Sequence, residues 1–182
     1  MTPEACERFD ACFRQHYARV LAYGLRRVPS RAAAEDVAAE TFLVAWRRLD
    51  ELPRDPLPWL LGIARHVIQN ELRSARRRDR LAARVGAQSR GQADGTITSG
   101  PPGQEQVLTA LERLGERDRE VLLLATWDRL DRRQAAAVLG CSHGAFAVRL
   151  HRARARLARE LKASAAAASV RAPATELTKE MP

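Results

Sequence analysis

The side chains best suited to bind a ligand in this 182-residue sequence are arginines, which gather in two stretches. Residues 73–80 read RSARRRDR, and residues 149–159 carry arginine at every second or third position. Arginine's planar guanidinium matches phosphate oxygens and the edge of guanine. The chain has 31 Lys and Arg against 22 Asp and Glu, a formal net charge of +9. It is therefore expected to concentrate around polyanions such as nucleic acids, with binding that weakens as salt rises. The same composition also suits an anionic membrane surface or the codon bias of a high-GC genome.

Residues that could catalyse a reaction form no recognisable pattern. The sequence shows neither a Gly-rich phosphate loop nor a nucleophile with a base partner. Cys12 and His16 lie one helical turn apart and could share a metal, but a half-buried helix face is the favoured interpretation. We therefore expect no enzyme activity, no cofactor and no metal. The histidines are His16, His66, His143 and His151, and the cysteines, an odd number without CxxC spacing, are Cys6, Cys12 and Cys141.

Apolar residues recur at helical spacing and no β pattern competes, so the sequence predicts an all-α fold. A first helix should open at Thr2, whose side chain would cap it, and end before Pro29. A second, capped by Ser30, covers AEDVAAETFLVAWRRL, and a third starts near Pro58, after the loop DELPRDPLP. The side chains expected inside are Phe9, Phe13, Tyr17, Val20, Leu21, Val37, Phe42, Leu43, Trp46, Trp59, Ile63, Val67 and Leu72, with Glu35, Asp36 and Glu40 outside.

Composition divides the chain into two small helical domains. Residues 83–104 are rich in Gly, Ser, Gln and Pro, which predicts a flexible linker between a domain at 1–82 and a domain at 105–162. Residues 163–182 are expected to form a frayed helix end and a disordered tail. The sequence has no apolar run of about 18 residues and no signal-peptide pattern at its start. We expect a cytoplasmic protein without membrane insertion.

The second domain contains the pattern of a helix-turn-helix. Small residues at 135–137 allow two helices to approach, Gly140 permits the positive φ that the turn needs, and Ser142 caps the next helix. That helix has an apolar side, with Phe146 and Leu157 and either Val148 or Leu150, and a basic side that fits a major groove. Structural bundles also contain such helices. The residues expected on the basic side are His143, Ala147, Arg149, His151, Arg152 and Arg156.

Four blocks of this sequence, taken together, resemble the extracytoplasmic-function group of bacterial sigma factors. They are AEDVAAETFLVAWRRL, PWLLGIARHVIQNELRSARRR, ALERLGERDREVLLL and LGCSHGAFAVRLHRARARL, in the family's order and spacing, and the match covers residues 9–161. The resemblance implies region 2 and region 4 domains joined by a linker. It also implies an alternative sigma factor that binds core RNA polymerase and directs it to promoter DNA without hydrolysing nucleotides.

The resemblance implies a polymerase-binding surface on the second predicted helix. In the family, this helix docks on a coiled coil of the polymerase's largest subunit, which places Asp36, Glu40, Phe42 and Trp46 at or beneath the interface. Ala39 stands where Gln is common. The alternative is an ordinary solvated acidic face, with Phe42 and Trp46 simply in the core.

The resemblance also implies that the loop at residues 50–57 and the third helix read the minus-10 element and capture a flipped base. A protein without a motor opens DNA by binding the single strand better than the duplex. His66 stands where the family usually has Asn, so the preferred base is not predicted and a pH dependence could follow. The arginines after it suit phosphates, or form a solvated helix end. The residues concerned are Arg54, Trp59, Arg65, His66, Asn70, Arg73, Arg76, Arg77, Arg78 and Arg80.

The helix after the turn is expected to read the minus-35 element. Ala147 and Val148 cannot donate hydrogen bonds, so base contacts would fall to Arg149, Arg152 and His143, with apolar contact to a thymine methyl also possible. Two further departures from the family are Gly115 for Pro and Arg129 for Gly. The positions carried over are Ser142, His143, Ala147, Val148, Arg149, His151 and Arg152.

Two other functions remain open at this point. A stand-alone helix-turn-helix regulator would bind duplex DNA without polymerase, and it would not need the PWLLGIARHVIQNELRSARRR block. A scaffold whose basic helices bind RNA or acidic proteins would not discriminate promoter from random DNA. Many relatives are held inactive by an anti-sigma protein, so such a partner is expected, although no motif identifies it.

Overall fold

The computed structural model describes residues 2–84 and 104–171, and nearly all of the predicted linker lies outside these ranges. No strand occurs in the described residues, and the predicted all-α fold is confirmed. The elements are α1 (Pro3–Leu25), α2 (Arg31–Arg47), the 3-10 turn η1 (Leu49–Glu51), α3 (Pro56–Arg84), α4 (Gln104–Arg113), α5 (Glu116–Thr126), α6 (Arg132–Val138) and α7 (His143–Arg171).

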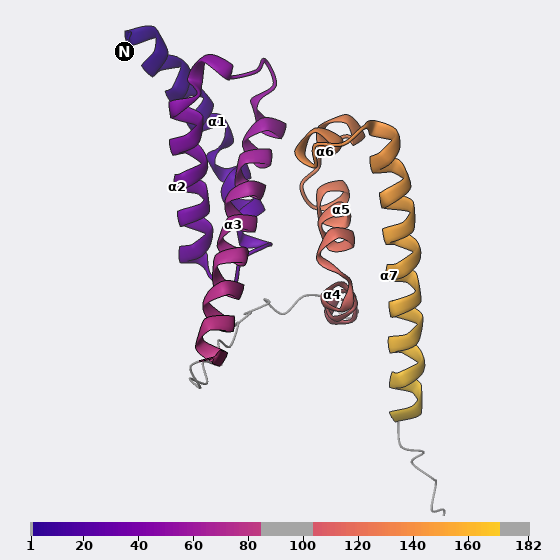
Figure 1. The fold of residues 1–182 in the computed structure, drawn as a ribbon. Helices are drawn as coiled ribbons and strands as arrows, with labels where there is room; N and C mark the ends of the chain where they lie inside the picture. Colours follow the sequence, from indigo (N-terminus) through magenta and orange to yellow (C-terminus); the bar gives the residue numbers. More distant parts are fainter. Residues whose placement is uncertain (1, 85–103, 172–182) are drawn as a thin grey trace, which may run out of the picture.

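Helices α1, α2 and α3 pack against one another as one bundle (Figure 1). The helices α1 and α2 approach closely at Gly24, where a Cβ would lie 3.3 Å from the backbone and side chain of Ala34. An aromatic group at the other end of the bundle joins the same helices, with the rings of Phe9 and Trp46 packed edge to face at 4.7 Å. The central buried side chains are Val20, Tyr23, Val37, Phe42, Leu60, Leu61 and Ala64.

The inward face of this bundle differs in part from the predicted stripe. Phe13, Leu43 and Leu72 were expected inside but are exposed, at 37%, 42% and 38%. Cys12 and His16 are buried instead. The apolar positions of each helix span more than one face, and only the packing of the three helices decides which of them is covered.

The predicted caps are confirmed at Ser30 and wrong at Thr2. The Ser30 side chain accepts a hydrogen bond from the amide of Ala33 at 3.2 Å. Thr2 occupies the N-cap position of α1 and its carbonyl accepts hydrogen bonds from the amides of Ala5 and Cys6, but its side chain accepts no cap hydrogen bond. Pro in the first turn and Glu4 still favour a helix start there.

Helices α4, α5 and α6 pack around the long helix α7 and form the second unit (Figure 1). Its core contains Leu111, Val121, Leu124, Phe146 and Leu150. Helix α7 continues to Arg171, in the part of residues 163–182 where the sequence predicted a helix end, and residues 172–182, where the disordered tail was expected, lie outside the described ranges.

Arg119 fixes the turn between α4 and α5. Its guanidinium donates to the carbonyl oxygens of Leu111 at 2.9 Å, Glu112 at 2.6 Å and Leu114 at 3.3 Å. These carbonyls lie at the end of α4, where the helix leaves its last acceptors without partners. The Arg119 side chain therefore caps the C-terminus of α4.

The two units contact each other. Helix α3 packs against α6, and polar side chains of α1 donate hydrogen bonds to Glu120 of α5 and to Asp128, which follows α5. The sequence predicted two independent domains joined by a flexible linker, and this contact was not part of that prediction. This contact places the region around α3 directly beside the helix-turn-helix.

Candidate nucleic-acid interface

Helices α6 and α7 form the predicted helix-turn-helix. A capping box starts α6, in which the Asp131 side chain accepts from the amide of Gln134 while the Gln134 side chain accepts from the amide of Asp131. Gly140 has a φ of 61°, as the turn requires. Ser142 then caps α7 by accepting from the amide of Ala145 at 3.2 Å. Local backbone chemistry therefore fixes the start of the predicted recognition helix.

The N-terminal half of α7 is divided into a buried and an exposed side. Phe146, Leu150 and Ala153 are buried in the second unit, at 0%, 4% and 0% exposure. Val148 is 51% exposed, so Leu150 and not Val148 is the packing residue of that pair. Of the residues predicted to read minus-35, Ser142, His143, Val148, Arg149, His151 and Arg152 are exposed and Ala147 is half-buried. The structure thus brings the predicted minus-35 residues together on one accessible side of a helix.

The residues predicted to read minus-10 fall into two groups. Trp59, Arg65 and His66 line a cavity of about 670 Å³. The opposite wall of that cavity is α6 and the turn that follows it, including Arg133 and Gln134. The Gln134 side chain donates to the carboxylate of Asp55 at 2.9 Å, which joins the loop before α3 to α6. The first group therefore faces the second unit.

The second group lies further along α3 and is exposed. Arg73 donates to the side-chain oxygen of Asn70 at 2.7 Å, and Arg77 donates to the hydroxyl of Ser74 at 3.1 Å. Arg76 forms an ion pair with Glu116 of α5. Arg54 and Arg78 are also exposed, in the loop before α3 and on α3 itself. The basic end of α3 is accessible to a polyanion except where Arg76 is occupied by Glu116.

Helix α2 presents the predicted acidic face. Asp36 and Glu40 are exposed and one turn apart, whereas Phe42 is 3% exposed and Trp46 is half-buried. Phe42 and Trp46 therefore lie on the inward side of α2, beneath the acidic face. Partial burial and the Asp36 carboxylate raise the pKa of Glu71 on α3, and the effect of Asp36 indicates that the Glu71 carboxyl group lies near this face. Sequence reasoning missed Glu71, because only the packing of α3 on α2 brings it near Asp36.

Arg129, in the loop between α5 and α6, has an unusual backbone conformation. It is the only non-glycine residue with positive φ in the described ranges, with a φ of 50°. The position therefore has the left-handed backbone conformation that glycine adopts most readily. This conformation explains why the family commonly has Gly where this chain has Arg129.

Among residues 2–84 and 104–171, no group of three or more His, Cys, Asp or Glu side chains is placed to hold a metal ion. Burial lowers the pKa of His16, whereas the Asp55 carboxylate raises it and the Arg19 guanidinium lowers it further.

None of the helices in the described ranges combines the length and hydropathy of a membrane span.

Two family models match the chain, and they match it in the order of the two structural units. Sigma-70 region 2 matches residues 12–78, which lie in the α1–α3 bundle. Sigma-70 region 4 matches residues 104–157, from the start of α4 into α7. Because the first unit also matches a sigma-factor region, a stand-alone helix-turn-helix regulator is not supported.

Similar proteins cover both units. The RNA polymerase sigma factor NccH of Alcaligenes xylosoxydans xylosoxydans is 33% identical over 165 residues, 82% of this chain and 85% of NccH. The ECF RNA polymerase sigma factor SigC of Mycobacterium tuberculosis is 34% identical over 156 residues, 82% of this chain and 80% of SigC. A protein described as Probable RNA polymerase sigma factor RfaY, from Xanthomonas campestris pv. campestris, is 36% identical, but the match spans only 34% of RfaY.

Solved structures share the fold. The sigma factor RpoE of Bartonella quintana, in complex with the anti-sigma factor NepR, matches with a TM-score of 0.67 and 24% identity, over 85% of this chain and 96% of RpoE. CnrH, in complex with the cytosolic domain of CnrY, matches with a TM-score of 0.60 and 25% identity, over 87% of this chain and 95% of CnrH. Both family models and the relatives that align along most of their length agree, and the chain belongs to the sigma-70 family as a sigma factor of the extracytoplasmic-function group.

Proposed function

We propose that this sigma factor binds core RNA polymerase through α2 and directs it to promoters by reading two DNA elements, minus-10 with the α3 unit and minus-35 with α7. The observation that carries the proposal is that α7 has one buried apolar side and one exposed basic side. Its buried side is fixed by Phe146 and Leu150, and its exposed side presents Arg149 and Arg152 from a helix-turn-helix. The same chain carries a second basic helix end on a separate bundle.

Base readout by α7 would rest on a few side chains. Arg149 and Arg152 are three residues apart, so they lie on one face of the helix and can reach neighbouring base pairs. An arginine that donates twice to guanine gives about 1–3 kcal/mol of discrimination. Val148, 51% exposed and beside Arg149, offers apolar contact to a thymine methyl.

The α3 unit would act on the single strand. Trp59 offers a stacking surface, and Arg65 beside it offers a cation for the phosphate chain. Holding a flipped base in such a site offsets the cost of unstacking it, a few kcal/mol. The exposed arginines at the end of α3 would add phosphate contacts without sequence information. The core polymerase, and not this chain, would perform the chemistry.

Two further parts of the proposal concern its surroundings. We place the protein in the cytoplasm, where core RNA polymerase and the chromosome are. Since the sigma factor RpoE of Bartonella quintana was solved with an anti-sigma factor, we also expect an anti-sigma protein to bind this chain.

Run-off transcription with sigma-free bacterial core polymerase and a promoter library tests the proposal. The full chain should produce discrete start sites that share two upstream sequences. Replacing Arg149 and Arg152 by alanine should reduce initiation at these sites at least tenfold, since each base contact contributes roughly 1–3 kcal/mol. The matched control replaces two exposed arginines of α1, Arg8→Ala with Arg14→Ala, and should initiate like the original protein. Absence of initiation together with absence of core binding would refute the proposal.

A further inference from the structure

Arg48 lies beside the proposed single-strand site, although it was not among the residues predicted to bind DNA. It is the C-cap residue of α2, and its side chain lines the same cavity as Trp59 and Arg65. Its guanidinium carbon lies 5.8 Å from the centre of the Trp59 ring, near the outer limit of a cation–π contact. Arg48 therefore adds a cation from α2 next to the stacking surface of Trp59.

Glu51 holds the Arg48 side chain in this position. Arg48 donates to one carboxylate oxygen of Glu51 at 2.9 Å and forms an ion pair with the other. The turn η1 fixes the spacing of the two residues, because the Glu51 amide donates to the Arg48 carbonyl at 2.9 Å. The hydrogen bond from Arg48 lowers the pKa of Glu51, which keeps the carboxylate ionised. Two guanidinium groups of Arg48 therefore already bind an anion in the paired geometry that arginine also uses for a phosphate.

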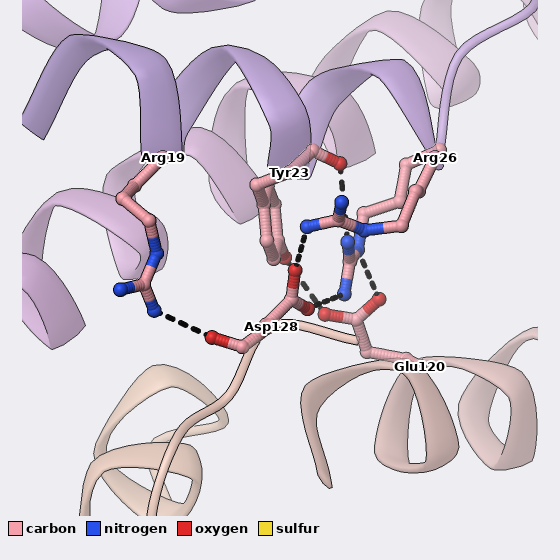
Figure 2. A network of polar contacts seen from close by, with 6 residues as sticks. Arg19, Tyr23, Arg26, Glu120 and Asp128 are labelled. Atoms are coloured by element: carbon pink, nitrogen blue, oxygen red, sulfur yellow. Dashed lines mark hydrogen bonds and ion pairs between the residues drawn. The ribbon is translucent and has the colours of Figure 1, made fainter. Parts of the chain in front are cut away.

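The ion pair of Arg48 and Glu51 can be exchanged for another because it is exposed. The two side chains are 47% and 55% exposed, and exposed ion pairs contribute little to stability. Arg27 on α1 is the contrasting case, since its side chain is 6% exposed and donates to the carboxylates of Glu120 and Asp128 (Figure 2). Arg48 lines the cavity whereas Glu51 is not among its lining residues. A phosphate can therefore approach Arg48 from the cavity and displace Glu51.

The surroundings of Trp59 suit a phosphate chain. Sites for single-stranded nucleic acid combine an aromatic side chain, on which a base stacks, with cations that follow the backbone on either side of it. Trp59 is the aromatic side chain here, and Arg65 of α3 and Arg48 of α2 supply cations from two different helices. The charged residues that line the cavity are Arg48, Arg65, Arg133, His66 and a single carboxylate, that of Asp55. The balance of charge in the cavity therefore favours an anion.

We propose that Arg48 binds a phosphate of the single strand next to the base that stacks on Trp59, and that Glu51 occupies Arg48 until this phosphate displaces it. Glu51 thus positions the guanidinium at the site and also competes with DNA for it. The role of Arg48 deepens the proposed function and rests on it for the identity of the strand. Binding of a single strand can nevertheless be measured without promoters or polymerase.

The first test measures how tightly the full chain binds a fluorescein-labelled single-stranded oligonucleotide of mixed sequence, by fluorescence anisotropy at several salt concentrations. Arg48→Ala should reduce the slope of log affinity against log salt by about 0.7, the contribution of one phosphate on a single strand. The same contribution lowers the affinity about fivefold at about 0.1 M salt. Arg48→Lys keeps the charge and should keep the slope. The matched control is Arg31→Ala, which removes an exposed arginine paired with Glu35 at the other end of α2 and should change neither quantity.

The second test concerns the competition by Glu51. Glu51→Gln should raise the affinity for the oligonucleotide roughly twofold to fivefold, because an exposed ion pair of modest strength no longer occupies Arg48. The matched control is Asp50→Asn, which removes the same charge from the neighbouring exposed side chain. The effect of Glu51→Gln should exceed that of Asp50→Asn when Arg48 is present and equal it when Arg48 is replaced by alanine. This double-mutant cycle separates competition for Arg48 from a general loss of negative charge.

The outcomes separate the role of Arg48 from the proposed function. An unchanged salt slope and affinity in Arg48→Ala, or no binding of the oligonucleotide by the original chain, overturns the role of Arg48. An effect of Glu51→Gln that is the same with and without Arg48 overturns the competition. If the original chain initiates transcription at discrete sites while Arg48→Ala binds the strand normally, the proposed function stands and only the role of Arg48 fails. If no variant and no original chain initiates while the slope falls as expected, the proposed function fails and Arg48 remains a single-strand contact.

Discussion

Replacing Gly140 by alanine should destabilise the second unit through the backbone alone. Gly140 has a φ of 61°, and a Cβ added there would meet nothing within 4 Å, so the substitution adds no packing contact and no clash. An L residue in the left-handed region costs roughly 1–2 kcal/mol. Alanine also restricts the unfolded chain, which returns roughly 0.4–1 kcal/mol. The difference predicts a loss of about 1 kcal/mol.

The same reasoning predicts the opposite sign at Arg129. This residue already has a φ of 50° and its side chain is exposed. Arg129→Gly removes the left-handed cost of roughly 1–2 kcal/mol and increases the entropy of the unfolded chain by roughly 0.4–1 kcal/mol. The second unit should gain up to about 1 kcal/mol of stability.

Native-state amide hydrogen exchange measures these changes in each unit separately, which a single unfolding curve of a two-unit chain does not. The slowest amides of α5 and α7 report the second unit, and those of α2 report the first, which should not change. Gly144→Ala is the matched control. Gly144 lies in α7 without positive φ and with nothing within 4 Å of an added Cβ, so alanine should stabilise the unit. If Gly140→Ala stabilised it too, the backbone argument would be wrong.

Three further predictions concern the interface and the core. Ser142→Ala removes the cap of α7 and should cost about 1 kcal/mol, seen as faster exchange at the amide of Ala145, with Ser142→Asp as the variant that keeps the cap. If Arg149 binds phosphate, Arg149→Ala should lower the DNA affinity for all sequences and reduce the slope of log affinity against log salt by about 1. If Arg149 reads a base, the variant should lose discrimination at one base pair while the slope stays unchanged. Burial lowers the pKa of His16 in the folded chain, so the folded form binds its proton less readily than the unfolded form. The stability that His16 contributes should therefore be fully present above the ordinary histidine pKa and fall as the pH drops below about 6.5. His16→Gln should flatten this dependence in unfolding experiments run between about pH 5 and pH 8.

Periodicity and capping chemistry predicted the helices well. Ser30 and Ser142 each precede an apolar repeat, and both cap the expected helix in the structure. Gly140 was identified as the turn from its position between two such repeats, and its φ agrees. These features depend on residues close together in the sequence, which is why the sequence alone was sufficient.

Packing between elements was predicted less well. Leu43 and Leu72 have the residue type of core positions and are exposed, because each helix carries more apolar residues than its neighbours cover. Glu120 and Asp128 have the residue type of solvated positions and are mostly buried. Their burial depends on Arg27, about a hundred positions away along the chain. No local pattern reports such a distant partner.

The candidate site was likewise predicted only where it depends on a single helix. Exposure of Arg149 and Arg152 followed from the amphipathic pattern of one helix. The placement of Trp59 and Arg65 opposite α6 did not, because it depends on how two separately folded units meet. The contribution of Glu71 to the acidic face was missed for the same reason.

The covalent connection between the units changes what the contact around Asp128 must achieve. Two parts of one chain meet at an effective concentration on the order of millimolar, set by the connecting segment and not by the amount of protein. A contact far too weak to join two separate molecules at micromolar concentration can therefore keep the two units together within one. The α4–α7 unit, added as a separate polypeptide, would then bind the α1–α3 unit poorly, and within one chain the contact would form independently of how much sigma factor the cell contains.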